Sequence, residues 1–177
     1  MNEEFTRVAC TSQAHGAQVL AIFNEAIANS TAIYEYRPRT ARMIEDWFEE
    51  KLRDGRPVIG LVDRTETLAG FGTFGTFRAR PAYKYTVEHS VYVRADRRGR
   101  GIGTRLLAEL IDAARAMEVH TMVGGIDAAN EASIALHRRF GFEHAGTVRE
   151  AAFKFGRWLD LAFYQLILET PRQPLEG

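Results

Sequence analysis

A basic, glycine-rich loop is the part of the sequence best suited to hold an anion. It runs from Arg97 to Gly103, after an apolar stretch and before an amphipathic one. Glycines remove the Cβ atoms that would keep a phosphate away from the backbone. The N–H groups and the dipole of a following helix favour negative charge, and Arg97, Arg98 and Arg100 add positive charge. The pattern favours a pyrophosphate site; the alternative is a basic turn that caps a surface helix.

Two well-known phosphate-binding patterns do not fit this loop. The dinucleotide fingerprint needs a third glycine three residues after the second, and from Gly99 and Gly101 that position is Thr104. The phosphate loop of nucleotide hydrolases needs Gly-Lys followed by Ser or Thr, and the sequence has no such tripeptide. The loop therefore points to a pyrophosphate carried by another kind of ligand.

A carboxylate just upstream is suited to proton transfer. Residues 86–93 read as a strand, and alternation places Glu88, Ser90 and Tyr92 on one face of it. A carboxylate near an amine can accept its proton directly or through water. The alternative interpretation is a glutamate that simply faces solvent.

Two arginines precede that strand. Arg78 and Arg80 carry guanidinium groups that match a carboxylate or a phosphinate, although loop arginines are often only solvated. Phe77, Tyr83 and Tyr36 are candidates for pocket walls or for core packing.

These residues must be positioned by a mixed set of helices and strands. Apolar periodicity predicts helices over residues 14–29, from the N-cap Thr40 to about 54, after the glycine loop, and over 130–140. The buried stripe of the second helix is expected to be Met43, Ile44, Trp47, Phe48 and Leu52, and that of the third Leu106, Leu107, Leu110, Ile111 and Ala114. Strands are predicted over residues 58–63, 68–77, 86–93, 120–126, 142–149 and 158–168. This order favours an α/β fold with a mixed sheet.

Composition narrows the class of protein. The 177 residues fit a single domain, residues 1–177 with a core of about 6–169. Lys+Arg and Asp+Glu are both 23, so nothing indicates a nucleic-acid partner. The sequence shows neither a secretory signal nor an apolar stretch long enough for a membrane span, and its one cysteine, Cys10, fits a cytoplasmic location. The five histidines lack zinc-ligand spacing, so no metal is expected.

The glycine loop also carries a family signature. Arg98-x-x-Gly101-x-Gly103 resembles the Arg/Gln-x-x-Gly-x-Gly/Ala motif of the GNAT superfamily of N-acetyltransferases, whose loop holds the pyrophosphate of acetyl-CoA. The chain is similar to the phosphinothricin and methionine sulfoximine N-acetyltransferase branch in residues 74–83, 86–93 and 154–160, and in Leu136-His137 with Gly141-Phe142.

The resemblance implies a site and a co-substrate. The fold would be a GNAT-like single domain with a central, mostly antiparallel sheet flanked by helices. Acetyl-CoA would be held by Val91, Tyr92, Val93, Arg98, Gly99, Arg100, Gly101, Ile102, Gly103, Thr104, Asn130 and Ser133. The amine substrate would be bound by Arg78, Ala79, Arg80, Glu88, His89 and Ser90, with Glu88 as the base.

One catalytic role stays open at this point. Many members of the superfamily have a tyrosine that protonates the departing thiolate where this sequence has Leu136-His137. His137 could donate that proton, because imidazole titrates near neutrality, or it could be a structural histidine. Asn130 and Ser133 could equally be the N-cap and first turn of a helix.

The sequence therefore predicts an enzyme, an acetyl-CoA-dependent N-acetyltransferase of a small amino-acid-like amine. The amine would be of the phosphinothricin or methionine sulfoximine/sulfone type, attacking the thioester directly in a ternary complex. The alternatives are a protein or peptide N-terminal acetyltransferase and a non-catalytic acyl-CoA-binding sensor domain. By analogy with the branch, we expect a homodimer.

Overall fold

The computed structural model describes residues 4–176. These residues form two compact units, which are described separately. The first consists of residues 4–74 and 90–110, and the second of residues 75–89 and 111–176. Three elements run from one unit into the other: strand β3 (Leu68–Thr76), strand β4 (Thr86–Val93) and helix α3 (Ile102–Ala116).

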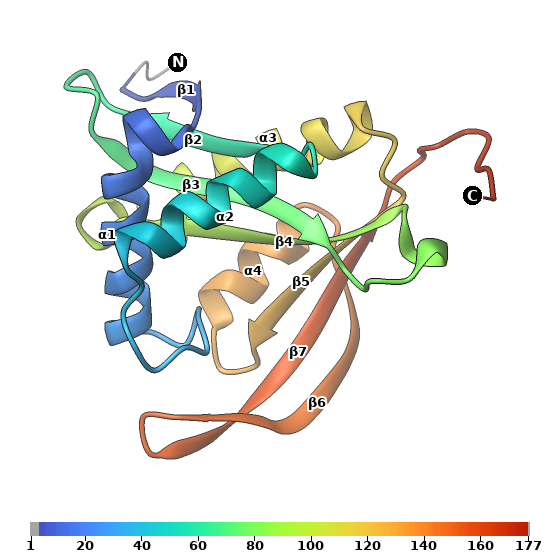
Figure 1. The fold of residues 1–177 in the computed structure, drawn as a ribbon. Helices are drawn as coiled ribbons and strands as arrows, with labels where there is room; N and C mark the ends of the chain where they lie inside the picture. Colours follow the sequence, from blue (N-terminus) through green and yellow to red (C-terminus); the bar gives the residue numbers. More distant parts are fainter. Residues whose placement is uncertain (1–3, 177) are drawn as a thin grey trace. The chain divides into compact units, whose positions relative to one another are not determined.

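The first unit carries the predicted anion-binding loop. Its other elements are β1 (Thr6–Ala9), α1 (Ser12–Asn29), α2 (Ala41–Arg53), β2 (Val58–Val62) and most of β3 (Leu68–Thr76), labelled in Figure 1. Strand β2 pairs antiparallel with both β1 and β3. Helices α1 and α2 begin where a threonine side chain accepts a backbone N–H: Thr11 from Ala14 at 3.2 Å and Thr40 from Met43 at 3.3 Å.

An aromatic cluster forms the core of this unit. Phe23 of α1 packs edge-on against Trp47, Phe71 and Tyr92, with ring centroids 5.4, 5.0 and 5.0 Å away. The predicted α2 stripe is only partly correct. Ile44 and Phe48 are buried, but Met43 and Leu52 are 47% and 83% exposed, so the buried face of α2 is narrower than its apolar pattern indicates. The predicted α3 stripe is confirmed, with all five residues buried.

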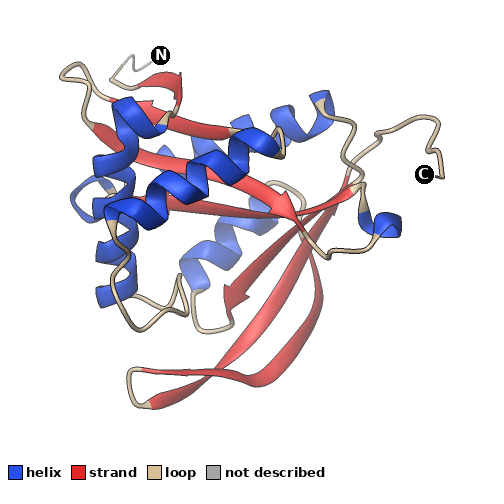
Figure 2. Ribbon diagram, viewed as in Figure 1, coloured by secondary structure: helices blue, strands red, loops and turns tan. Residues whose placement is uncertain are grey.

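The second unit is dominated by a long β-hairpin. This unit contains the first residues of β4 and the whole of β5 (Thr121–Asp127), α4 (Glu131–Arg139), β6 (Glu143–Lys154) and β7 (Arg157–Ile167). A short 3₁₀ turn at Pro81–Tyr83 precedes β4. Strands β6 and β7 form an extended antiparallel arm joined by a tight turn (Figure 2). Strand β7 also pairs antiparallel with β5. Strand β5 pairs in parallel with β4, and the last pair of that ladder is Glu88↔Val123.

The hydrogen-bonded strand order is β1-β2-β3-β4-β5-β7-β6, in one sheet. This mixed, mostly antiparallel α/β sheet confirms the predicted fold class. Two details differ from the prediction. Strand β1 was not expected, and β6 continues to Lys154 past a bulge between Val148 and Ala152, where Glu150 has a φ of +51°. Among residues 4–176, no helix is both long and apolar enough to cross a membrane.

Candidate active site

The glycine loop has an open backbone at the start of α3. Gly99 and Gly101 have φ angles of +76° and +77°, a region that side chains with a Cβ rarely adopt. A Cβ built on either residue would meet nothing within 4 Å, so the space beside the backbone is free. The predicted loop is slightly too long, because α3 begins at Ile102 and already includes Gly103 and Thr104 in its first turn. An amide-lined approach of this kind suits an anionic ligand.

Each loop arginine is paired with a carboxylate from a distant part of the sequence. Arg97 contacts Asp63 at 3.0 Å, Arg98 contacts Glu25 at 2.9 Å and Arg100 contacts Glu4 at 3.0 Å. The Arg98 and Arg100 side chains are 52% and 43% exposed. Ion pairs this exposed contribute little, at most about 1 kcal/mol. The Arg98 and Arg100 side chains can therefore turn towards a phosphate at small cost, whereas the Arg97–Asp63 pair is less exposed.

The end of β4 lies directly before this loop. Val91, Tyr92 and Val93 are all half-buried, and the Tyr92 ring belongs to the aromatic cluster. The Val93 carbonyl accepts a hydrogen bond from Arg98 Nε at 3.4 Å. The structure thus anchors the loop to the strand, and the residues present fit a pyrophosphate. Contact with acetyl-CoA stays a prediction for all of them.

Glu88 occupies a half-buried position on β4 in the second unit. Burial raises the pKa of its carboxyl group, and the Arg78 guanidinium opposes that rise. A Cβ built on Gly125 of β5 would lie 3.1 Å from Glu88 Oε1. The missing side chain of Gly125 therefore makes the room in which the Glu88 carboxyl group sits, and the raised pKa makes that group a better proton acceptor.

The opposite face of β4 carries a buried histidine pair. His89 and His137 are 5% and 6% exposed, with their Nε2 atoms 2.9 Å apart. The His137 Nδ1–H donates to the Ser133 carbonyl at 2.7 Å, so Nε2 of neutral His137 must accept from His89. Burial lowers the pKa of His89 to about 3, with His137 adding to the effect, and burial also lowers the pKa of His137. The pair is therefore uncharged at neutral pH. His89 was predicted to line the substrate; it packs instead against His137 and Phe142.

The other predicted substrate residues lie at the surface of the second unit or on β4. Arg78, Ala79 and Arg80 are in the segment before β4, where Arg80 is exposed. The Arg78 guanidinium stacks 4.2 Å from the Phe77 ring centroid, and that ring packs edge-on against Tyr83 at 5.9 Å. Ser90 of β4 is half-buried. Tyr36, also considered as a pocket wall, belongs to the first unit and is 74% exposed.

The predicted cofactor residues of α4 form its N-terminal cap. Asn130 Oδ1 accepts the Ser133 N–H at 3.1 Å. Both residues are half-buried. The capping interpretation is therefore correct, and it does not compete with a cofactor contact, because the Asn130 side chain also has donor N–H groups.

Sequence reasoning missed the pair Gly124-Gly125 in β5. A Cβ on Gly124 would lie 3.0 Å from His89 Cε1 and 3.1 Å from His137 Nε2, so the two glycines make room for the histidine pair and for Glu88. Two glycines inside a predicted strand were the available signal, since such glycines often mark a close approach.

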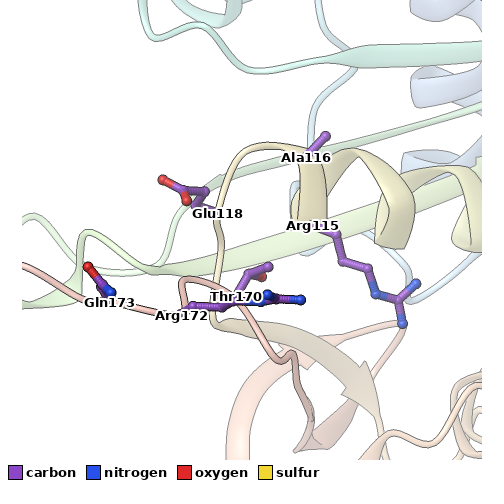
Figure 3. Close-up of a pocket in the computed structure, with 6 residues that line it drawn as sticks. All are labelled: Arg115, Ala116, Glu118, Thr170, Arg172 and Gln173. Atoms are coloured by element: carbon purple, nitrogen blue, oxygen red, sulfur yellow. The ribbon is translucent and has the colours of Figure 1, made fainter.

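A hollow lies at the end of α3. It is lined by Arg115, Ala116, Glu118, Thr170, Arg172 and Gln173, drawn in Figure 3. None of the predicted site residues in the described chain lines it. Arg115 is paired with Asp112 at 3.1 Å. In residues 4–176 no cluster of three or more His, Cys, Asp or Glu side chains is arranged to hold a metal ion.

A mixed sheet, a basic glycine-rich loop at the start of a helix and a half-buried carboxyl group on the strand before it are together the arrangement that the resemblance to the N-acetyltransferases predicts. Residues 20–142 match the acetyltransferase (GNAT) family. The chain belongs to this family, as its loop motif indicated.

Relatives and solved structures agree with this assignment. The chain is 45% identical over 154 residues to an L-methionine sulfoximine/L-methionine sulfone acetyltransferase of Pseudomonas aeruginosa, covering 87% of this chain and 90% of that protein. It is 38% identical to a phosphinothricin N-acetyltransferase of Streptomyces coelicolor, covering 81% and 85%. A phosphinothricin acetyltransferase from Sinorhizobium meliloti, solved with acetyl-CoA, superposes with a TM-score of 0.92 at 34% identity, covering 98% and 95%.

Proposed function

We propose that the protein transfers the acetyl group of acetyl-CoA to the amine of a small amino-acid-like substrate of the methionine sulfoximine or phosphinothricin type. The relatives named above, which act on such compounds, support the substrate class. The near end-to-end match with them supports one catalytic domain. The observation that carries the proposal is the half-buried Glu88 carboxyl group, with its raised pKa, beside Gly125.

Glu88 would act as the base. A substrate amine is mostly protonated at neutral pH, and only the neutral amine attacks a thioester. Glu88 accepts the proton directly or through water. The amine nitrogen then bonds to the acetyl carbon, the carbon–sulfur bond breaks and the thiolate of coenzyme A leaves. Backbone N–H groups of β4 beyond Glu88, where its ladder with β5 has ended, would stabilise the developing oxyanion.

The structure supports direct attack rather than a covalent acetyl-cysteine intermediate. Burial raises the pKa of Cys10 to about 12, so its thiol is not a nucleophile at neutral pH. His137 is poorly placed to protonate the thiolate, because its Nδ1–H is used by the Ser133 carbonyl and its Nε2 faces His89. We therefore assign the histidine pair to packing beneath β4.

Arg78 and Arg80 would recognise the acidic end of the substrate. Both side chains belong to the segment just before β4, and Arg78 is close enough to Glu88 to influence its pKa. A carboxylate or phosphinate held there would leave the amine of the same small molecule near Glu88. This arrangement favours a compact substrate over a peptide.

The test is thiol release from acetyl-CoA with a panel of amines. We expect turnover with methionine sulfoximine or phosphinothricin and little with peptides. Turnover of peptides alone would instead indicate a protein acetyltransferase, and coenzyme A binding without any turnover would indicate a sensor domain. Glu88→Gln should lower kcat/KM by about 100-fold or more and leave acetyl-CoA affinity, measured by calorimetry, within about twofold. Wild-type activity in Glu88→Gln would reject Glu88 as the base.

We also propose that the protein forms a homodimer through the β6–β7 arm. Large apolar side chains are exposed along this hairpin: Val148, Phe153, Phe155, Trp158 and Ile167 are 45–58% exposed. Exposed apolar surface of this kind favours association. Sedimentation of the wild type should give a dimer, and Trp158→Ser should weaken it. A monomeric wild type at micromolar concentration would contradict this proposal.

A further inference from the structure

Arg157 opens β7, and the proposed reaction gives its side chain no part. It lies in the run of residues 154–160, one of the stretches that resemble the acetyltransferase branch. Its Nη2 donates to Asp127 Oδ2 at 3.1 Å. The Asp127 side chain is 3% exposed, whereas that of Arg157 is 51% exposed. A buried carboxylate is costly unless it is paired, so this contact compensates a charge that the fold has placed inside the second unit.

The other oxygen of Asp127 holds the turn between β5 and α4. Oδ1 accepts the Ala129 N–H at 3.0 Å, and the Asp127 backbone carbonyl accepts the Asn130 N–H at 2.8 Å. From β7, the Asp160 carbonyl accepts the Ala128 N–H at 2.8 Å. The whole turn is thus fixed from both ends by Asp127 and by the strand that carries Arg157.

From this turn, hydrogen bonds lead to the residues predicted to contact acetyl-CoA. Asn130 caps Ser133, and the Ser133 carbonyl accepts from His137. A displacement of the Asp127 carboxylate would remove its contact with the Ala129 N–H and so loosen the turn that ends at Asn130. A buried ion pair usually stabilises a fold no more than well-packed apolar side chains of similar size would. Here the same carboxylate also orients the turn.

We propose that Arg157 and Asp127 form a positioning pair that sets the Asn130–Ser133 end of α4 for the pantetheine arm of acetyl-CoA. The inference rests on the proposed function, since it needs acetyl-CoA as the ligand of this end of α4. Neither side chain takes part in the chemistry. Loss of the pair should therefore weaken acetyl-CoA binding more than it slows the bound enzyme.

The test compares Arg157→Gln with the wild type, using acetyl-CoA and methionine sulfoximine. KM for acetyl-CoA should rise about tenfold, within the range for residues that act on a site through others, with kcat and KM for the amine changed less than about threefold. Arg157→Lys should restore most of the affinity. The double variant Arg157→Gln/Asp127→Asn should lose less affinity than the sum of the two single variants, because both changes remove the Arg157–Asp127 contact. Arg149→Gln, at an exposed arginine of β6, is the matched control.

Calorimetry with acetyl-CoA separates failure of this inference from failure of the proposed function. If the wild type binds no acetyl-CoA, the proposed function is wrong. If the wild type binds it and folded Arg157→Gln binds it equally well, only the positioning role is wrong.

If Arg157→Gln folds poorly, Asp127→Asn tests the same pair in its place. Asp127→Asn keeps an oxygen that can accept the Ala129 N–H but removes the charge that pairs with Arg157. Affinity for acetyl-CoA about tenfold below that of the wild type, at unchanged kcat, would support the pair. Wild-type affinity in this variant would overturn it.

Discussion

The glycines of the anion loop and the glycines of β5 belong to different units and use different properties of the same residue. Gly99 and Gly101 have positive φ angles, and a Cβ on either would have no neighbour within 4 Å. Gly124 and Gly125 belong to a regular strand, but a Cβ on either would lie within 3.1 Å of a side-chain atom from elsewhere in the chain. The loop needs glycine for its backbone conformation and access, and the strand needs it for the absence of a side chain.

This difference separates ligand binding from packing. Changes in the loop should act mainly on acetyl-CoA affinity, and changes around Gly124 should act mainly on the stability of the fold. Changes at Gly125 should affect both stability and activity, because Gly125 makes room for the side chain of Glu88, the proposed base.

Acid should destabilise the protein through the histidine pair beside Gly124. The pKa of His89 is near 3 in the folded chain and about 6.5 in an unfolded one. Between these values the unfolded chain binds a proton that the folded chain does not, so stability falls as the pH drops below about 6.5. The slope from His89 is up to about 1.4 kcal/mol per pH unit, which amounts to about 2 kcal/mol between pH 6.5 and about 4.5.

Urea unfolding at a series of pH values measures this slope. His89→Leu should reduce this slope by the amount that corresponds to about one bound proton. His144→Gln, at an exposed histidine of β6, should leave it unchanged. A slope that His89→Leu does not alter would show that the pair is not the source of the acid sensitivity.

Gly124→Ala should destabilise the fold by about 1–3 kcal/mol, because its methyl group would lie 3.0 Å from the His89 ring and 3.1 Å from the His137 ring, closer than packed side chains normally approach, and both rings are buried. Gly125→Ala meets the flexible end of Glu88 instead, so it should cost less stability and lower kcat/KM. Thermal melts and thiol release on the two variants provide the comparison. Equal loss of stability in both would remove the distinction between them.

The contrast also explains what the sequence could predict. The conformation of the loop could be predicted because glycine spacing encodes backbone conformation locally, and Gly99 and Gly101 do have positive φ angles. The binding of a pyrophosphate there stays a proposal. The helices predicted over residues 14–29 and from Thr40 to about 54 rest on equally local signals, an apolar period in both and a capping threonine in the second. Met43 and Leu52 were misplaced because periodicity gives the direction of a face but not how far its partner extends.

Contacts between residues far apart in sequence could not be predicted in this way. His89 and His137 are separated by 48 positions, and the ion pair of Arg98 with Glu25 by 73. Strand β1 has only four residues and no buried alternation, so its pairing with β2 left no pattern to find. The role of Gly124-Gly125 likewise depends on which side chains face β5, which the topology decides.

Gly101→Ala should lower acetyl-CoA affinity about tenfold, or by about 1.4 kcal/mol, because its methyl group would occupy the space beside the amides. A φ of +77° also costs an alanine about 1–2 kcal/mol of stability. Gly55→Ala is the matched control, because Gly55 has a φ of +63°, equally open surroundings and a place in the turn after α2. Both variants should lose similar stability in thermal melts, and only Gly101→Ala should lose affinity in calorimetry. Equal affinities would contradict the assignment of the loop to the pyrophosphate.

Arg98→Gln should have the smallest effect, lowering acetyl-CoA affinity by no more than about fivefold. Its guanidinium is half-exposed and already paired with Glu25, so contact with a phosphate replaces one exposed ion pair by another, and such pairs contribute at most about 1 kcal/mol. The change should nevertheless make binding less sensitive to salt, because exposed charges are screened. Arg42→Gln, which removes an exposed ion pair with Asp46 on α2, is the control. Calorimetry at two salt concentrations measures both effects. A loss of affinity above about 100-fold would mean that the side chain, rather than the backbone around the two loop glycines, provides the main grip on the anion.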